Sequence, residues 1–198
     1  MSKTILYSIA FLTGFAVMAY EILGVRVLSP YYGSSVHVWG AIISVFLAGL
    51  SIGYAAGGRF ADKNASIRTL SKIIIVPSAL IVLFPFYGYF ICNLFFNHVA
   101  DSKLGALLLS IALFMLPCAF MGAVVPVLVK MLATDSGLVG AAAGNVYSVS
   151  TAGSIAGTIF TSFFLISLVS VSKGIMLTGF LLAACWFLCL IYDRAGRL

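Results

Sequence analysis

The sequence predicts an all-α integral membrane protein whose single domain, residues 1–198, is a bundle of six transmembrane helices. Of the 198 residues, 63% are hydrophobic and only 8% are charged, whereas about 25% of an ordinary soluble domain is charged. Long apolar segments recur along the whole chain, and a soluble fold of this size could not bury so much apolar surface. Both observations indicate a chain that crosses the membrane repeatedly.

Six segments are long enough to cross a bilayer, because about 20 apolar residues span ~30 Å of hydrocarbon. We expect the first to be retained, since its apolar stretch is longer than that of a signal peptide and no A-x-A-like cleavage site follows it. The expected spans cover residues 4–28, 37–58, 73–95, 104–130, 141–168 and 174–192.

Lysine and arginine predict the orientation of the spans. Eight of these bases share one side: Lys3, Arg59, Lys63, Arg68, Lys72, Lys130, Arg194 and Arg197. Lys103 and Lys173 lie on the other side, and Arg26 lies near the outer end of the first span. We therefore expect an inner (cytoplasmic) membrane protein with both termini in the cytoplasm. Bases clustered at loop ends are a topology signal, so the net charge of +6 does not predict a nucleic-acid partner.

The first span carries a carboxylate at membrane depth. Glu21 lies ~25 Å from the cytoplasmic end of an ideal helix, where it needs a partner, a proton or a wet cavity. Arg26 lies about one turn further out, and His37 follows the turn. Two interpretations stay open: a polar pocket that opens outward, built on these three residues, or a structural ion pair that joins spans one and two.

The second span carries glycines at intervals of four, which share one helix face and let a neighbouring helix approach closely. They are Gly49, Gly53 and Gly57, and the fifth span repeats the feature with Gly153 and Gly157. Spans two and five hold matching places in two three-helix halves, which suggests an inverted repeat like that of many transporters. Packing without any transport role is the alternative.

Spans three and four each contain two prolines, which predict kinks whose freed carbonyl groups need other partners. The four cysteines lie inside apolar segments without zinc-type or C-x-x-C spacing, so we interpret them as packing residues and expect no metal and no cofactor.

The fifth span carries a row of polar side chains. They follow a spacing of three or four and therefore share a face: Tyr147, Thr151, Ser154, Thr158 and Thr161. Such a face either lines a hydrated cavity or donates hydrogen bonds to neighbouring helices.

Four segments resemble the membrane portion of spermidine-synthase-like transmembrane proteins, also called fused major-facilitator/spermidine-synthase proteins. They are YEILGVRVLSPYYGSSVHVWG, FLAGLSIGYAAGGRFADK, MGAVVPVLVKML and AGNVYSVSTAGSIAGTIFTSFFLI. The resemblance implies a bundle similar to one half of a major-facilitator fold, with Tyr20, Glu21 and Arg26 among the matching positions. It implies no transferase activity in this chain, because the soluble aminopropyltransferase-like domain usual in that family does not follow the sixth span.

The segment GYAAGGRFADK also resembles the loop between helices two and three of major-facilitator transporters, where an Asp and an Arg latch the cytoplasmic side. The resemblance implies a latch between Arg59 and Asp62. A solvated loop that only sets topology is the alternative.

We expect a membrane subunit of a spermidine-synthase-like system that docks a separate synthase-like partner and passes a small cationic or polyamine-like solute. Its polar pocket would comprise Glu21, Arg26, Tyr20, His37, Tyr147, Thr151 and Ser154. The alternatives are a homodimeric half-size transporter and a structural subunit of a larger membrane complex. We do not expect an intramembrane enzyme, because the chain has neither an H-E-x-x-H nor a G-x-S-x-G motif.

Overall fold

The computed structural model describes residues 3–99, 101–133 and 139–195. Six of its helices are long and apolar enough to cross a membrane, so the chain is an all-α, multi-pass membrane protein. The first three helices are α1 (Lys3–Tyr32), α2 (Val36–Asn64) and α3 (Ile67–His98). The fourth span joins α4 (Ser102–Ser110), the π-helical segment η1 (Ile111–Met115) and α5 (Leu116–Leu132). The fifth joins α6 (Val139–Phe160), the π-helical segment η3 (Thr161–Leu165) and α7 (Ile166–Leu168), and the sixth is α8 (Val171–Ala195).

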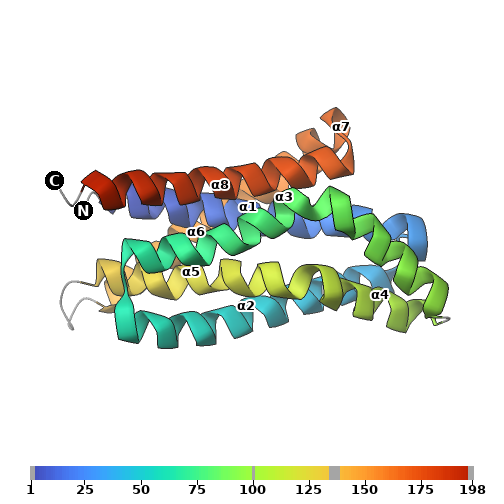
Figure 1. Ribbon diagram of the computed structural model, residues 1–198, viewed down its shortest axis with the longest axis horizontal. Helices are drawn as coiled ribbons and strands as arrows, with labels where there is room; N and C mark the ends of the chain where they lie inside the picture. Colours follow the sequence, from blue (N-terminus) through green and yellow to red (C-terminus); the bar gives the residue numbers. More distant parts are fainter. Residues whose placement is uncertain (1–2, 100, 134–138, 196–198) are drawn as a thin grey trace.

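Every predicted span lies within one of these helices, and most of the helices extend beyond the apolar core at both ends. The extra turns are polar or amphipathic, such as the end of α2 at Asp62–Asn64, and their peptide groups are bonded within the helix. The helices run nearly lengthwise, and α1 begins at the end of the bundle where α8 finishes (Figure 1).

The turn after α1 is closed by a glycine. The Gly33 amide donates to the Ser29 carbonyl at 2.9 Å, and Gly33 has a φ of 73°, a conformation that glycine adopts without steric cost. Pro30 lies inside the last turn of α1. These features let α2 start four residues after α1 finishes and return along the bundle.

Three helix pairs form the most extensive contacts: α1 with α6, α2 with α5, and α3 with α8. If the two halves are equivalent, α1 corresponds to α5, α2 to α6 and α3 to α8. The α1–α6 pair then corresponds to the α5–α2 pair, and the α3–α8 pair corresponds to itself. The next contacts, α1–α8 and α3–α5, exchange in the same way. This pairing is the one that an inverted repeat of three helices requires.

The two parallel pairs also share their register. A Cβ on Gly53 would meet the carbonyl oxygen of Ala119, and a Cβ on Gly153 would meet that of Phe11. Four residues on, Gly57 faces Ala123 and Gly157 faces Phe15. Equivalent positions therefore differ by 108 residues between α1 and α5, and by 100 between α2 and α6. The same offset of 100 aligns Gly53, Ala56, Gly57 and Phe60 with Gly153, Ala156, Gly157 and Phe160.

A cluster of aromatic rings fills the core between these pairs. Tyr20 is fully buried and its ring lies 5.8 Å from Phe46 and 5.2 Å from Phe114. The Tyr20 hydroxyl donates to the carbonyl of Leu113 in η1 at 3.5 Å. Pro117 has no amide hydrogen to give to that carbonyl four residues back, so the tyrosine supplies a donor where the proline removed one.

Candidate functional site

The polar side chains of α6 lie on one side of the helix. Tyr147, Thr151 and Thr158 are exposed, and Ser154 is half-buried. Exposed apolar side chains lie beside this row: Ile155 follows Thr151 by four residues and borders it, and Ile159, the neighbour of Thr158 in sequence, lies about 100° further around the helix. The helix therefore presents an ordinary lipid-facing surface and, beside it, a polar one.

The polar side of α6 is turned toward α2. The rings of Tyr54 on α2 and Tyr147 on α6 meet edge to face, with centroids 6.3 Å apart. Ser51 and Tyr54 on α2 occupy the places equivalent to Thr151 and Ser154 on α6. We call this surface the α2–α6 face, defined by Leu47, Ser51, Tyr54, Tyr147, Thr151, Ser154 and Thr158.

Glu21 lies on the side of α1 that also carries residues of the bundle interior. It follows Gly14, Val17 and Met18 at intervals of seven, four and three, so it shares their side of the helix. Glu21 is half-buried and has no hydrogen bond or ion pair to any described residue. The Cys118 thiol on α5 lies close enough to interact with it electrostatically. The carboxylate thus stands at membrane depth without the arginine partner that a structural ion pair would require.

The structure distributes the remaining predicted pocket residues over three places. Arg26 is exposed on another side of α1, and His37 lies at the start of α2 in a groove that it shares with Ser44 and Lys103. Tyr20 faces the aromatic core. Tyr147, Thr151 and Ser154 lie together on the α2–α6 face. The contacts of Gly153 with Phe11 and of Gly157 with Phe15 place Glu21 further along the bundle, level with the segment that follows Thr158.

A small cavity lies behind this face, between the two halves of the fold. Its volume is about 70 Å³. Its lining includes five pairs of residues that are equivalent in the two halves of the fold. They are Thr13 with Met121, Gly14 with Gly122, Val17 with Val125, Leu50 with Ser150, and Tyr54 with Ser154. We call it the central cavity, and it lies where the internal repeat predicts a symmetric junction.

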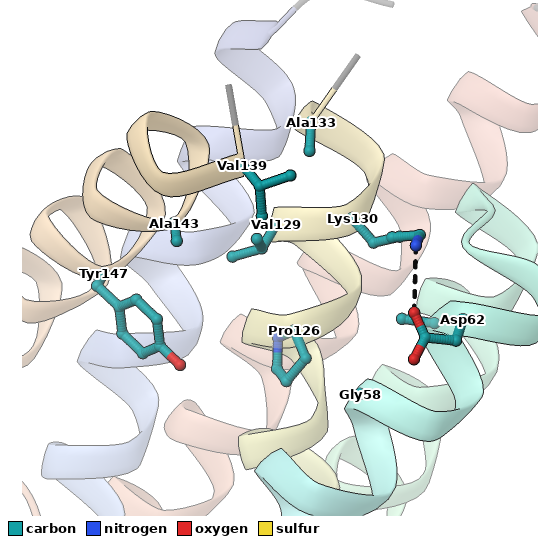
Figure 2. A pocket seen from close by; sticks show the side chains of 10 residues that line it. Gly58, Asp62, Pro126, Val129, Lys130, Ala133, Val139, Ala143 and Tyr147 are labelled. Carbon is teal, nitrogen blue, oxygen red and sulfur yellow. Dashed lines mark hydrogen bonds and ion pairs between the residues drawn. The ribbon is translucent and has the colours of Figure 1, made fainter. Parts of the chain in front are cut away.

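A larger pocket of about 350 Å³ opens at the end of the bundle where α1 begins. Figure 2 shows Tyr147, Ala143 and Val139 of α6 on one side, and Gly58 and Asp62 of α2 on the other. Lys130 of α5 donates to Asp62 at 3.1 Å across this opening. Arg59 makes no ion pair with any described residue, so the ion pair at this place joins α2 to α5 instead of closing within α2. The ion pair between Lys130 and Asp62 is exposed, with 53% of the lysine side chain and 75% of the aspartate side chain accessible, so it contributes little stability.

The five glycines predicted to pack helices all lie against a neighbouring backbone or side chain. Gly49, Gly53 and Gly57 face α5 or η1, whereas Gly153 and Gly157 face α1. A methyl group at any of them would force the neighbouring helix to move.

No group of three or more His, Cys, Asp or Glu side chains that could hold a metal occurs within residues 3–99, 101–133 and 139–195. The four cysteines are free and buried in the apolar core. The lining of the central cavity by Thr13 and Ser150 was not predicted, because a single hydroxyl in an apolar run carries no periodic signal. The lysine partner of Asp62 was also missed, because it lies 68 residues away in sequence.

The bases of the described residues divide between the two ends of the bundle. Lys3, Arg59, Lys63, Arg68, Lys72 and Lys130 belong to the end where α1 begins, and Lys103 and Lys173 to the other. Arg197 and the side chain of Arg194 lie outside the described part of the chain. A comparison with protein-family models, with curated proteins and with solved structures finds no match to this chain, so the family resemblance stays a prediction.

Proposed function

We propose that this chain is half of a membrane transport unit, in which two copies meet through the α2–α6 face and enclose a hydrated path for a small cationic solute. The observation that supports this best is Glu21, a half-buried carboxylate without a hydrogen bond or ion pair among the described residues. In hydrocarbon such a group is costly, and carboxylates at this depth mark solute or proton paths. Water or a cationic solute supplies the interaction that no side chain gives.

The polar side of α6 supports the same proposal. Tyr147 and Thr151 are exposed at positions from which lipid could offer no hydrogen bonds, and beside them the exposed Thr158 donates to the Ser154 carbonyl at 2.9 Å. The symmetry of a homodimer would set one α2–α6 face opposite another, so that the same hydroxyl groups approach from both sides. Six spans per copy then give a twelve-span assembly.

Uptake into proteoliposomes tests the transport proposal. The resemblance to spermidine-synthase-like proteins makes labelled spermidine and putrescine the first solutes to try. We expect uptake by the wild type and at least a tenfold loss in Glu21→Gln, which removes the charge and keeps the shape. Asp101→Asn is the matched control, because it makes the same change at an exposed carboxylate outside the spans. Equal uptake by Glu21→Gln and wild type would refute a path past Glu21, and a lack of flux with any cation would favour a structural subunit.

Cross-linking tests the second copy separately. In a chain whose four cysteines are replaced, Thr158→Cys should form a dimer with a short bifunctional thiol reagent in membranes. Ile159→Cys, at the same depth but about 100° around the helix, should stay monomeric. Dimers of Ile159→Cys alone would assign the interface to the apolar side of α6.

The basic end of the bundle favours a second candidate function, the docking of a soluble synthase-like partner with an acidic surface. Arg59, Lys63 and Lys72 are exposed there and make no ion pair with a described residue. Such a partner should copurify in mild detergent with the wild type and be lost when all three bases are changed to glutamate. Retention by the triple variant would exclude these bases as the docking site.

A further inference from the structure

The central cavity contains a polar atom that the fold leaves without a partner. Thr13 is only 2% exposed, and its hydroxyl oxygen has no hydrogen bond to any described residue. Two other buried hydroxyls donate to the carbonyl four residues back, Ser110 to Ala106 at 2.7 Å and Thr178 to Gly174 at 3.0 Å, whereas the buried hydroxyl of Thr161 also has no partner among the described residues. Thr13 lines the central cavity, so its hydroxyl is available to an occupant of that cavity.

The other groups that line the cavity are neutral oxygen ligands. Tyr54, Ser150 and Ser154 contribute hydroxyls, and Ser154 already donates to the carbonyls of Gly14 at 3.2 Å and Ser150 at 3.1 Å. Its oxygen therefore keeps free lone pairs. Pro126 has no amide hydrogen for the carbonyl of Gly122, which also lines the cavity.

This set of ligands selects a class of ion. Hydroxyl and carbonyl oxygens suit hard cations, whereas divalent ions are usually bound through carboxylates. No charged side chain lines the cavity. The nearest acidic group on the same side of α1 is Glu21, one turn beyond Met18, and when ionised it favours a cation over an anion.

The volume limits the occupant further. About 70 Å³ holds a small ion with a few waters, since a cavity of about 10–15 Å³ measured in the same way already holds one water. The cavity also lies at the junction of the two halves, where coupling ions bind in transporters built from inverted repeats. We propose that the central cavity binds one partly hydrated monovalent cation, of the size of Na⁺, through Thr13, Ser154 and neighbouring carbonyl oxygens. This site goes beyond the proposed transport function, because it binds its ion whether or not a solute passes the α2–α6 face.

The test is a sodium titration of the full-length protein in detergent at constant ionic strength, with choline as the replacing cation. We expect Na⁺ to raise the melting temperature of the wild type by ~2–5 °C, as one occupied site should, and ²²Na⁺ to bind at equilibrium. Thr13→Val removes the hydroxyl and keeps the shape, so it should lose both effects. Thr178→Val makes the same change at a buried threonine of α8 outside the cavity, and Thr13→Ser restores a hydroxyl, so both should keep them.

The outcomes are distinct. A wild type that shows neither a sodium-dependent shift nor ²²Na⁺ binding would overturn the proposal and leave ordered water as the occupant. Sodium effects of wild-type size in Thr13→Val would also overturn it. If Thr13→Val does not fold, sodium binding by Thr13→Ser and a tenfold weaker affinity in Ser154→Ala would still support the site, whereas unchanged affinity in Ser154→Ala would contradict it. Sodium binding without solute uptake would refute the transport function and leave this site standing.

Discussion

At the scale of single residues, a few buried hydroxyls bond to the backbone of a neighbouring helix. Pro117 removes a donor from the helix, and the Tyr20 hydroxyl reaches from α1 to the Leu113 carbonyl that has lost it. Ser78 on α3 donates to the Gly179 carbonyl on α8 at 3.1 Å without a proline nearby on α8. Within a membrane such bonds replace those that water would make, so they fix which helices are neighbours.

We expect Tyr20→Phe to lower the free energy of unfolding by ~0.5–1.5 kcal/mol, because it removes this one bond and keeps the ring. In a Pro117→Ala background the cost should shrink, since an alanine amide supplies the missing donor. A double-mutant cycle measured by denaturant unfolding in micelles checks the coupling. Equal costs in both backgrounds would mean that the tyrosine does not compensate for the proline.

Asp101 predicts a pH effect outside the membrane. Its carboxylate accepts from the amides of Leu104 at 3.0 Å and Lys103 at 2.8 Å at the start of α4, and these bonds lower its pKa below the ordinary value. The ionised cap therefore stabilises the folded state above the pKa of a free aspartate, about 4. This stability is lost as the pH falls through the lower folded value.

Asp101→Asn should keep the cap, because asparagine also accepts these amides, and should lose this part of the pH dependence. Melting curves between pH 2.5 and 7 compare the two proteins. The difference between their melting temperatures should narrow as the pH falls, and a constant difference would exclude a titrating cap.

At the scale of helices, glycines decide how closely the paired spans approach. The backbones of α2 and α5 touch at Gly53, and those of α1 and α6 touch at Gly153. By contrast, the space around Gly58 and Gly144 is open, with no atom within 4 Å of an added Cβ.

Gly53→Ala and Gly153→Ala should each destabilise the protein by about 1–3 kcal/mol, because the added methyl forces two helices apart. Their equivalence in the repeat predicts similar costs. Gly58→Ala and Gly144→Ala should be neutral or stabilise slightly, since alanine favours a helix. Thermal unfolding of the four variants measures this contrast, which a uniform response would contradict.

The sequence predicts the six spans because length and hydropathy determine them locally. Intervals of four in Gly49–Gly57 and Gly153–Gly157 also predict close-packed helices, and the polar row of α6 is visible from its spacing. The site is less predictable because it depends on which helices meet. Glu21 and Arg26 are close in sequence but lie on different sides of α1, and Lys130 reaches Asp62 only through the α2–α5 contact.

At the scale of the whole molecule, the division of bases between the two ends predicts the orientation. Reporter fusions at both termini and within residues 64–66 should all report the cytoplasm, and one within residues 99–101 should report the outside. A terminus on the side opposite to residues 64–66 would contradict an even number of spans.

The central claim is that the α2–α6 face meets water at the depth of the membrane. Labelling by a membrane-impermeant thiol reagent tests this most directly, in intact membranes and in a chain whose native cysteines are replaced. We expect Thr158→Cys on the polar side of α6 to react at least tenfold faster than Ile159→Cys, its neighbour in sequence, which lies at the same depth but about 100° around the helix. Equal and slow labelling at both positions would contradict it, because lipid would then cover both sides of α6.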